Sequence, residues 1–389
     1  MVRRSNSLFQ RLAATHAAMI AGDAAMVVAL ADSFFFDVDP NGARSRVLAF
    51  LLVSFAPFLV VAPMIGPAID RMPGGRRLVV RVMAIVRIVL AILMALNANS
   101  FVLFPLVFVA LVSQKSYAIA KSSLVPSVVT SEQELVEANS KLGLIAGVAG
   151  AIAVAPAGII QVALGTPATL VYSGVCFGVA LVASLQLPQE SQSDKVADDG
   201  GEQRDSPAIE MGWVAMFTLR AAAGFMLFHL AFWYRGMPGE KRLLAIAVGA
   251  SSLATMVGNA TAPKIRQRLA EEKMLLVALA LPAIAGLVAM VVGGVRIGIV
   301  VAASVNVAAA IGRLSFESLL QRDGSATDRG RAFARFELRF QLGWVGAAVL
   351  PVLVDIPGLI GLGLVGAVFA AAVINYARGL RQSVRPSFG

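Results

Sequence analysis

The sequence predicts an all-α membrane protein in which twelve transmembrane helices form two pseudo-repeats of six. Composition is the first reason: 58% of the 389 residues are hydrophobic and 14% are charged, whereas soluble domains are about half apolar and about a quarter charged. The apolar residues also form long continuous runs, which favour helices over the alternating strands of a membrane barrel. Finally, a polar and acidic segment, residues 188–209, divides the chain in two.

Twelve apolar runs are long enough to cross the hydrocarbon core, which takes about twenty helical residues. They lie near residues 12–35, 46–69, 78–97, 101–121, 141–164, 167–187, 211–233, 242–261, 274–292, 296–318, 335–355 and 358–377. The first run follows a basic N-terminus, as in a signal peptide, but it contains His16 and Asp23 and continues to Phe36. We therefore expect it to be retained as the first transmembrane helix.

The connectors between the runs alternate in positive charge. Basic residues gather in every second connector and at both ends of the chain, for example in residues 71–81, 264–273 and 378–385. Connectors 97–100 and 164–167, on the other side, carry no charge. By the positive-inside rule, this pattern predicts cytoplasmic termini and a multi-pass protein of the cell membrane. The net charge of +10 belongs to this topology pattern and does not indicate a nucleic-acid partner.

Residues that carry enzyme or metal chemistry are sparse. Cys176 is the single cysteine, so no disulfide or multi-cysteine metal site can form within the chain. His16 and His229 are the only histidines and are far apart in sequence. There is no phosphate-binding Gly-x-x-x-x-Gly-Lys-Ser/Thr loop, and no nucleophile–base pair stands out. We therefore expect no cofactor, no metal site and no enzymatic activity.

The two halves are expected to be separate bundles. Residues 1–187 form an N-terminal six-helix bundle, residues 188–209 a disordered cytoplasmic linker, and residues 210–389 a C-terminal six-helix bundle with a short basic tail. Pro67 and Pro263 are separated by nearly the same number of residues as Lys115 and Arg313. Two such landmarks with a shared offset indicate an internal repeat.

A short basic turn follows the second run. It contains Gly66, Asp70 and Arg71, and then the pair Arg76-Arg77. Together with the twelve runs and the central linker, this turn resembles the major facilitator superfamily, whose turn at this place reads roughly Gly-x-x-x-Asp-Arg-x-Gly-Arg-Arg. Two extra residues separate Arg71 from the arginine pair here. The resemblance implies that these five residues contribute to a cytoplasmic gate, although the positive-inside rule alone would also explain Arg76 and Arg77.

Further segments resemble the drug-efflux branch of that superfamily, typified by macrolide exporters. These are Gly22-Asp23 with the Ala-Leu pair that follows, residues 123–140 before the fifth run, and residues 329–335 before the eleventh. The antiporter motif of the fifth span, roughly Gly-Pro-x-x-Gly-Gly, is only partly present, because residues 155–158 keep the proline and one glycine.

Two charged residues lie near the middle of predicted spans in the first half. An ionised Asp23 in the first span is costly in the membrane, so it should face the bundle interior with a partner or take up a proton. Arg87 in the third span is the best candidate partner. Reversible proton binding at Asp23 and a purely structural ion pair with Arg87 are both compatible with this pattern.

Other polar residues within the spans are candidates for a substrate cavity. They are Gln114, Lys115, Tyr117, Arg220, His229, Asn306 and Arg313. Arg220 could attract an anionic substrate, or form an ion pair between helices. His229 lies in an aromatic cluster that also fits an interfacial belt. The others could bind substrate or connect helices by hydrogen bonds, and Lys115 and Arg313 could extend to the membrane surface.

These observations and the family resemblance imply a monomeric secondary active transporter. We expect proton-coupled efflux of a hydrophobic or amphipathic small molecule by alternating access. The low polar content of the spans favours an apolar substrate, because a sugar or amino-acid site would need more buried hydrogen-bonding groups. A lipid or lysolipid transporter is the alternative, and a non-transporting membrane scaffold or receptor is a more remote one.

Overall fold

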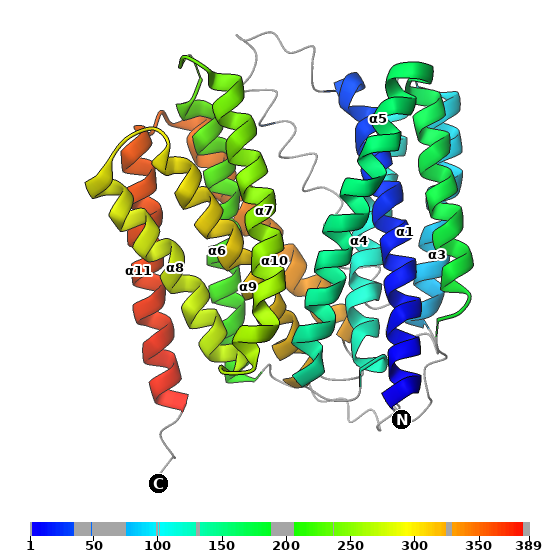
Figure 1. Cartoon of the computed structure of the whole chain (residues 1–389). Helices are drawn as coiled ribbons and strands as arrows, with labels where there is room; N and C mark the ends of the chain where they lie inside the picture. The colour runs from blue at the N-terminus through cyan, green and yellow to red at the C-terminus, as the bar shows by residue number, and fades with distance from the viewer. Residues whose placement is uncertain are drawn as a thin grey trace. The chain divides into compact units, whose positions relative to one another are not determined.

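A computed structural model gives the structure of the chain. It describes residues 2–34, 48, 75–98, 100, 102–129, 133–187, 206–235, 237–323 and 329–383. The described residues form ten α-helices and one short 3₁₀ helix (Figure 1). They divide into two compact units, each described by itself below. The first unit contains α1, α3, α4 and α5, and the second contains α6 to α9, α10 from residue 336 onward, and α11.

The first unit is built on α1, which packs along α5. Its helices are α1 (Val2–Phe34), α3 (Gly75–Leu96), α4 (Leu103–Leu124) and α5 (Gln133–Ser184). The α3 helix packs on both α4 and α5. The α5 helix is 52 residues long but is interrupted at Gly165, whose φ of 81° and ψ of −176° are not helical. Glycine adopts this backbone conformation without a Cβ clash, so α5 consists of two helical segments that match the predicted spans 141–164 and 167–187.

The second unit contains six consecutive helices, of which α10 belongs to it only from residue 336 onward. They are α6 (Pro207–Trp233), α7 (Glu240–Arg266), α8 (Glu271–Val292), α9 (Ile297–Asp323), α10 (Arg329–Leu353) and α11 (Gly358–Ser383). The α9 helix packs against α6, α7 and α8, and α8 also packs along α11. The contact between α8 and α11 is so close that a Cβ added to Gly286 would lie 2.5 Å from the backbone nitrogen of Gly366. Small residues at this point allow the two backbones to touch, as in membrane helix pairs.

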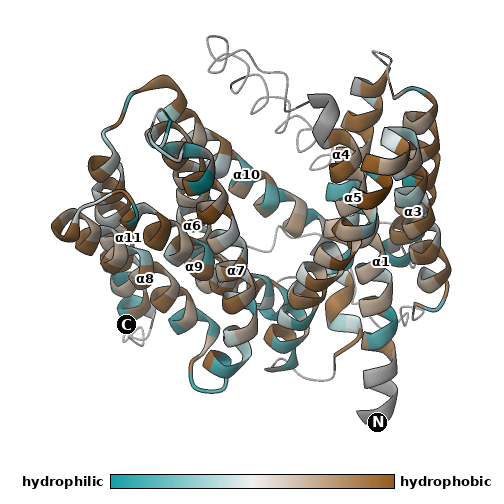
Figure 2. Cartoon of the chain, turned by 45° about the horizontal axis from the view of Figure 1, so that its top comes forward, coloured by the Kyte–Doolittle hydropathy of each residue, from teal (hydrophilic) through white to brown (hydrophobic). Residues whose placement is uncertain are grey.

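Hydrophobic residues predominate along the helices (Figure 2). Val162 and Val291 are 91% and 88% exposed, and many valines, leucines and isoleucines of α3, α5, α8 and α11 are also exposed. A soluble protein rarely exposes such extended apolar surface. Because these helices are long enough to cross a bilayer, an apolar surface of this kind suits contact with lipid.

The predicted number of spans is only partly reproduced. Nine helices among the described residues are long and apolar enough to cross a membrane. One of these is α5, which covers two predicted spans. The α4 helix coincides with predicted span 101–121 but is not one of the nine. Predicted span 46–69 lies outside the described residues apart from Leu48. Twelve spans, cytoplasmic termini and the 188–209 linker therefore stay predictions.

Candidate functional site

A buried charge cluster joins three helices of the first unit. Asp23 of α1 forms an ion pair through Oδ1 with Nη2 of Arg87 on α3. Its other oxygen, Oδ2, accepts a hydrogen bond of 3.2 Å from Nε2 of Gln114 on α4. Asp23 is 8% exposed and Arg87 is 1% exposed. The carboxylate is therefore enclosed by the protein and compensated by a partner on each side.

The fourth helix of this unit, α5, packs against the cluster beside Gly22 and Arg87. Gly22 precedes the aspartate, and a Cβ at this position would lie 2.5 Å from the ring of Phe177. The missing side chain therefore lets α5 approach α1, where the hydroxyl of Ser173 donates a 2.7 Å hydrogen bond to the Gly22 carbonyl. The Phe177 ring in turn lies 4.7 Å from the guanidinium carbon of Arg87, which is cation–π geometry.

The guanidinium of Arg87 is not fully satisfied. Its Nε and Nη1 atoms are buried and have no hydrogen-bond partner among the residues that the structure describes. Phe177 compensates only part of the charge, because an aromatic face attracts a cation more weakly than an anion does. Arg87 therefore depends on Asp23 for its compensation, and loss of the carboxylate charge leaves a buried cation without a counter-ion.

A second polar contact lies two helical turns from Asp23 along α1. The hydroxyl of Tyr117 on α4 lies 3.0 Å from Nδ1 of His16, and the two rings stack with centroids 5.9 Å apart. Both residues are buried. Because Gln114 and Tyr117 are three residues apart, they lie on the same face of α4. The interface between α1 and α4 therefore carries two polar contacts in line, one with the carboxylate and one with an imidazole.

The second unit contains a cavity of about 250 Å³ between α6, α7, α9 and α10. Arg220 lines it, and the Nη2 atom of this arginine donates to Oε1 of Glu337 on α10 at 3.3 Å. Their side chains are 28% and 32% exposed, so this ion pair is much more open than that of Asp23 and Arg87. Arg313 of α9 pairs with Glu317 at 2.8 Å and also interacts electrostatically with Glu337.

The cavity has a polar end and an apolar end. Its polar lining residues are Arg220, Ser251, Ser252, Thr255 and Asn306. Its apolar lining includes Met226, Leu227, Leu230, Leu244, Ala247 and Val248. Because α6 and α7 are joined by a short connector, they run antiparallel, and Thr255 comes level with Arg220 while Leu244 comes level with Leu230. Ten residues of helix separate Arg220 from Leu230, which is about 15 Å along the axis.

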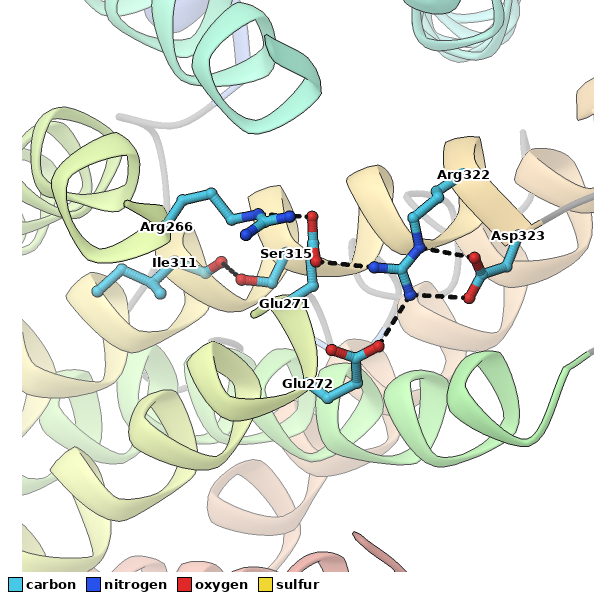
Figure 3. Close-up of polar contacts among 7 residues, drawn as sticks. All are labelled: Arg266, Glu271, Glu272, Ile311, Ser315, Arg322 and Asp323. Carbon is cyan, nitrogen blue, oxygen red and sulfur yellow. Dashed lines mark hydrogen bonds and ion pairs between the residues drawn. The ribbon is translucent and has the colours of Figure 1, made fainter. Parts of the chain in front are cut away.

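A denser charge network ties three helix ends of the second unit together (Figure 3). Glu271 at the start of α8 is fully buried and accepts from Nε of Arg266, at the end of α7, at 2.7 Å. Its other oxygen accepts from Nη1 of Arg322, at the end of α9, at 2.9 Å. Arg322 also donates to Glu272 at 2.8 Å and to Asp323 at 2.6 and 3.0 Å. Acidic residues at a helix start and basic residues at helix ends also suit the helix dipoles.

Comparison with known proteins identifies the chain. Residues 14–348 match the family model of the Major Facilitator Superfamily. The chain belongs to the Major Facilitator Superfamily. It is 27% identical over 412 residues to the uncharacterized protein ML2143 of Mycobacterium leprae, a match that covers 94% of this chain and 70% of the relative. Membership makes the chain a multi-pass membrane transport protein rather than a member of an enzyme family.

Solved structures share the fold at low sequence identity. A bacterial homologue of the iron transporter ferroportin, in an outward-facing state with soaked iron, has a TM-score of 0.74 and 18% identity, covering 97% of this chain and 100% of that chain. A variant of the E. coli fucose:proton symporter FucP has a TM-score of 0.73 and 14% identity, covering 97% and 99%. At these identities, the likeness shows the superfamily fold and says nothing of the substrate.

The gate turn of the superfamily is only partly visible here. Gly66, Asp70 and Arg71 lie outside the described residues. Arg76 and Arg77 lie in the first turn of α3, where Arg76 is 7% exposed and Arg77 is partly buried. The gating role of these five residues stays a prediction.

The remaining sequence candidates fall into different places. Asn306 lines the cavity of the second unit with Arg220, and its amide donates to the Ala302 carbonyl at 2.8 Å. Lys115 is half-buried on α4. His229 is 1% exposed, and its Nε2 lies 3.0 Å from the Gly358 carbonyl of α11. The structure therefore places His229 in a helix–helix contact and not on the cavity wall.

Several residues of these clusters were not among the sequence candidates. Glu337 is the most important, since it pairs with the cavity arginine. A carboxylate two residues into the predicted span 335–355 was a usable signal, because an intramembrane Arg220 requires an acidic partner. Phe177 and Glu271 carried no such signal: a phenylalanine in an apolar run looks like core, and a glutamate after a basic connector looks like surface.

Proposed function

We propose that this superfamily member is a secondary active transporter that exports a hydrophobic or amphipathic small molecule by alternating access, driven by proton entry. The observation that carries the proposal is the buried carboxylate of Asp23 in the first helix, held by Arg87 and Gln114. Intramembrane ionisable residues are costly and are generally kept for function. The resemblance of this segment and of residues 123–140 and 329–335 to the drug-efflux branch supports export.

Gln114 can hydrogen-bond to Asp23 in either protonation state. The Gln114 amide donates to the ionised carboxylate, and its oxygen can accept from the carboxyl once a proton is bound. Arg87 compensates the ionised state and keeps the face of Phe177 when Asp23 is neutral. Because the ion pair is closed in this structure, proton uptake requires that the pair opens to water during the transport cycle. Arg87 then acts as the counter-ion that Asp23 exchanges for a proton.

Transport in proteoliposomes tests this role. With an imposed pH gradient, a panel of amphipathic compounds should contain members that dissipate the gradient only when the protein is present. We expect Asp23→Asn to abolish this coupling. Because Asp23→Asn leaves Arg87 without a counter-ion and could simply misfold, the double variant Asp23→Asn/Arg87→Gln is the decisive one. It removes both charges, so it should fold, bind substrate and fail to couple.

The same experiment separates the alternatives. If the double variant retains pH-driven transport, then Asp23 and Arg87 are structural and another group carries the proton. Movement of labelled lysolipid that is independent of the pH gradient would identify a lipid transporter instead. If neither small molecules nor lipid move, the chain acts as a scaffold or receptor. We further propose that it works as a monomer in the cell membrane. The charge pattern of its connectors supports cytoplasmic termini.

A further inference from the structure

The cavity of the second unit has a cationic group at one end and an apolar lining at the other. We infer that it binds an amphipathic organic anion, whose carboxylate-type group pairs with Arg220 and displaces Glu337. This inference rests on the proposed transport function for its physiological meaning, because it names the class of substrate. The binding step itself can be tested without transport.

Arg220 has donor capacity to spare. Its guanidinium offers five N–H groups in a planar fork that matches a carboxylate. Nη2 donates to Glu337, while the buried Nε has no hydrogen-bond partner within the described part of the chain. The guanidinium can therefore donate hydrogen bonds to a new oxyanion, either beside Glu337 or in its place.

The present partner is held loosely. The 3.3 Å separation is long for a charge-assisted hydrogen bond, and both side chains are about a third exposed. Ion pairs this open add little net stability, so an incoming anion can replace the glutamate at small cost. Glu337 does not then lose all compensation, because Arg313 on α9 lies close enough to interact with it.

Among the polar groups that line the cavity, Arg220 is the one best suited to bind an anion. The Thr255 hydroxyl donates to the Ser251 carbonyl at 3.0 Å, and the Ser252 hydroxyl donates to the Val248 carbonyl at 3.0 Å. The Asn306 amide donates to its own helix as well. The Ser252 and Thr255 hydroxyls have therefore used their single hydrogens, whereas Asn306 keeps a second amide hydrogen. Because none of these groups is charged, they attract an anion less than the guanidinium does.

The dimensions fit a small aryl or alkyl acid. About 250 Å³ is just below the usual range of ligand-site volumes, which is about 300–1,000 Å³, so only a small acid fits. Trp344 also lines the cavity. It lies seven residues beyond Glu337 on α10, in the direction of the apolar end. An acid bound to Arg220 would therefore place its apolar group beside this indole.

That indole supplies a local readout. We would use protein in lipid nanodiscs and titrate it with 4-(4-bromophenyl)butyrate, whose bromine quenches a tryptophan that it touches. The neutral amide of the same acid is the matched control ligand. We expect saturable quenching by the carboxylate, and about 10- to 100-fold weaker binding of the amide, as loss of a hydrogen-bonded charge would give. Trp344→Phe should remove the quenching, while equilibrium dialysis still detects the bound acid.

Variants of the ion pair test the displacement. Arg220→Gln should erase the preference for carboxylate over amide, and Arg220→Lys should restore part of it. Glu337→Gln should tighten carboxylate binding about 2- to 5-fold, as removal of an exposed competing pair would give, and leave amide binding unchanged. Arg339→Gln is the matched charge control, because Arg339 stacks on Trp213 and does not line the cavity. It should behave as the unmodified protein.

Three results would overturn the inference. They are equal affinity for acid and amide in the unmodified protein, an acid preference that survives Arg220→Gln, and absence of saturable quenching by the acid up to millimolar concentration. Weaker acid binding in Glu337→Gln would refute the displacement. These binding measurements are independent of the Asp23 transport test. Anion binding without proton-driven transport would refute the proposed coupling but not the anion site. Coupled transport that is restricted to neutral compounds would refute the anion site but not the coupling.

Discussion

Neutralising Asp23 should destabilise the first unit far more than removal of a surface charge. In Asp23→Asn, Arg87 keeps the ring of Phe177 but loses its anion. The guanidinium is 1% exposed, so water cannot take over the compensation without opening the helix contacts. Breaking a buried ion pair from one side costs about 3–5 kcal/mol. The cation–π contact is present before and after the change, so it does not reduce this cost.

The double variant Asp23→Asn/Arg87→Gln separates the charge effect from packing. It leaves no uncompensated charge, and two amides can hydrogen-bond to each other and to Gln114. We expect it to regain most of the lost stability, because replacing a whole buried ion pair is often nearly neutral. The coupling energy between Asp23 and Arg87 from the double-mutant cycle should therefore be about 3 kcal/mol or more, at or above the upper end of usual values.

Unfolding in detergent, by heat and by denaturant, measures these differences. The signal is far-UV circular dichroism, because Trp213, Trp233 and Trp344 all lie in the second unit and would not report on the first. Glu210→Gln is the matched control, since Glu210 is an exposed carboxylate in the first turn of α6. Its loss should cost less than about 1 kcal/mol. If Asp23→Asn costs no more than Glu210→Gln, the enclosed ion pair does not hold the unit together and the reasoning fails.

Two further substitutions test packing and the charge network of the second unit. Gly286→Val should prevent folding or lower the melting temperature strongly, because the valine side chain would collide with the backbone of Gly366. Gly158→Ala is the control: its methyl group would point into open space, so it should be neutral in the same unfolding assay. Glu271→Gln should cost about 1.5–3 kcal/mol, because it weakens the charge-assisted hydrogen bonds from Arg266 and Arg322, while Arg322 keeps Glu272 and Asp323. An unchanged midpoint of denaturant unfolding would show that these two hydrogen bonds do not stabilise the second unit.

The helices could be predicted from sequence because lipid imposes long apolar runs, and the break in α5 was visible as Gly165 and Pro167. Near-central position in a span also pointed from Asp23 to Arg87. The partner of Arg220 did not share this central position, and its only sequence signal was a carboxylate just inside predicted span 335–355. Glu337 lies 117 residues further along the chain, near the start of its helix, so only the packing of α6 on α10 brings the pair together. The sequence shows how deep in the membrane a residue lies along its helix. The direction in which a polar side chain points depends on how the helix is rotated about its own axis.

Burial of charge was harder still to predict. Glu271 follows a basic connector, and nothing in that pattern distinguishes a solvated glutamate from one with no exposed surface. Its burial results from the convergence of two arginines from α7 and α9, which is a property of the assembled unit. His229 shows the converse, since its aromatic neighbours fitted an interfacial belt, yet its imidazole lies against the Gly358 carbonyl.

The Glu271 network also limits how the second unit can move. One carboxylate anchors the ends of α7 and α9 to the start of α8. Sliding any of these three ends past the others by a single helical turn would separate at least one arginine from it and leave the buried carboxylate with half of its counter-charges. The three helix ends therefore move together as one unit. Any bending of α7, α8 and α9 that accompanies substrate passage must occur further along these helices, away from the Glu271 network.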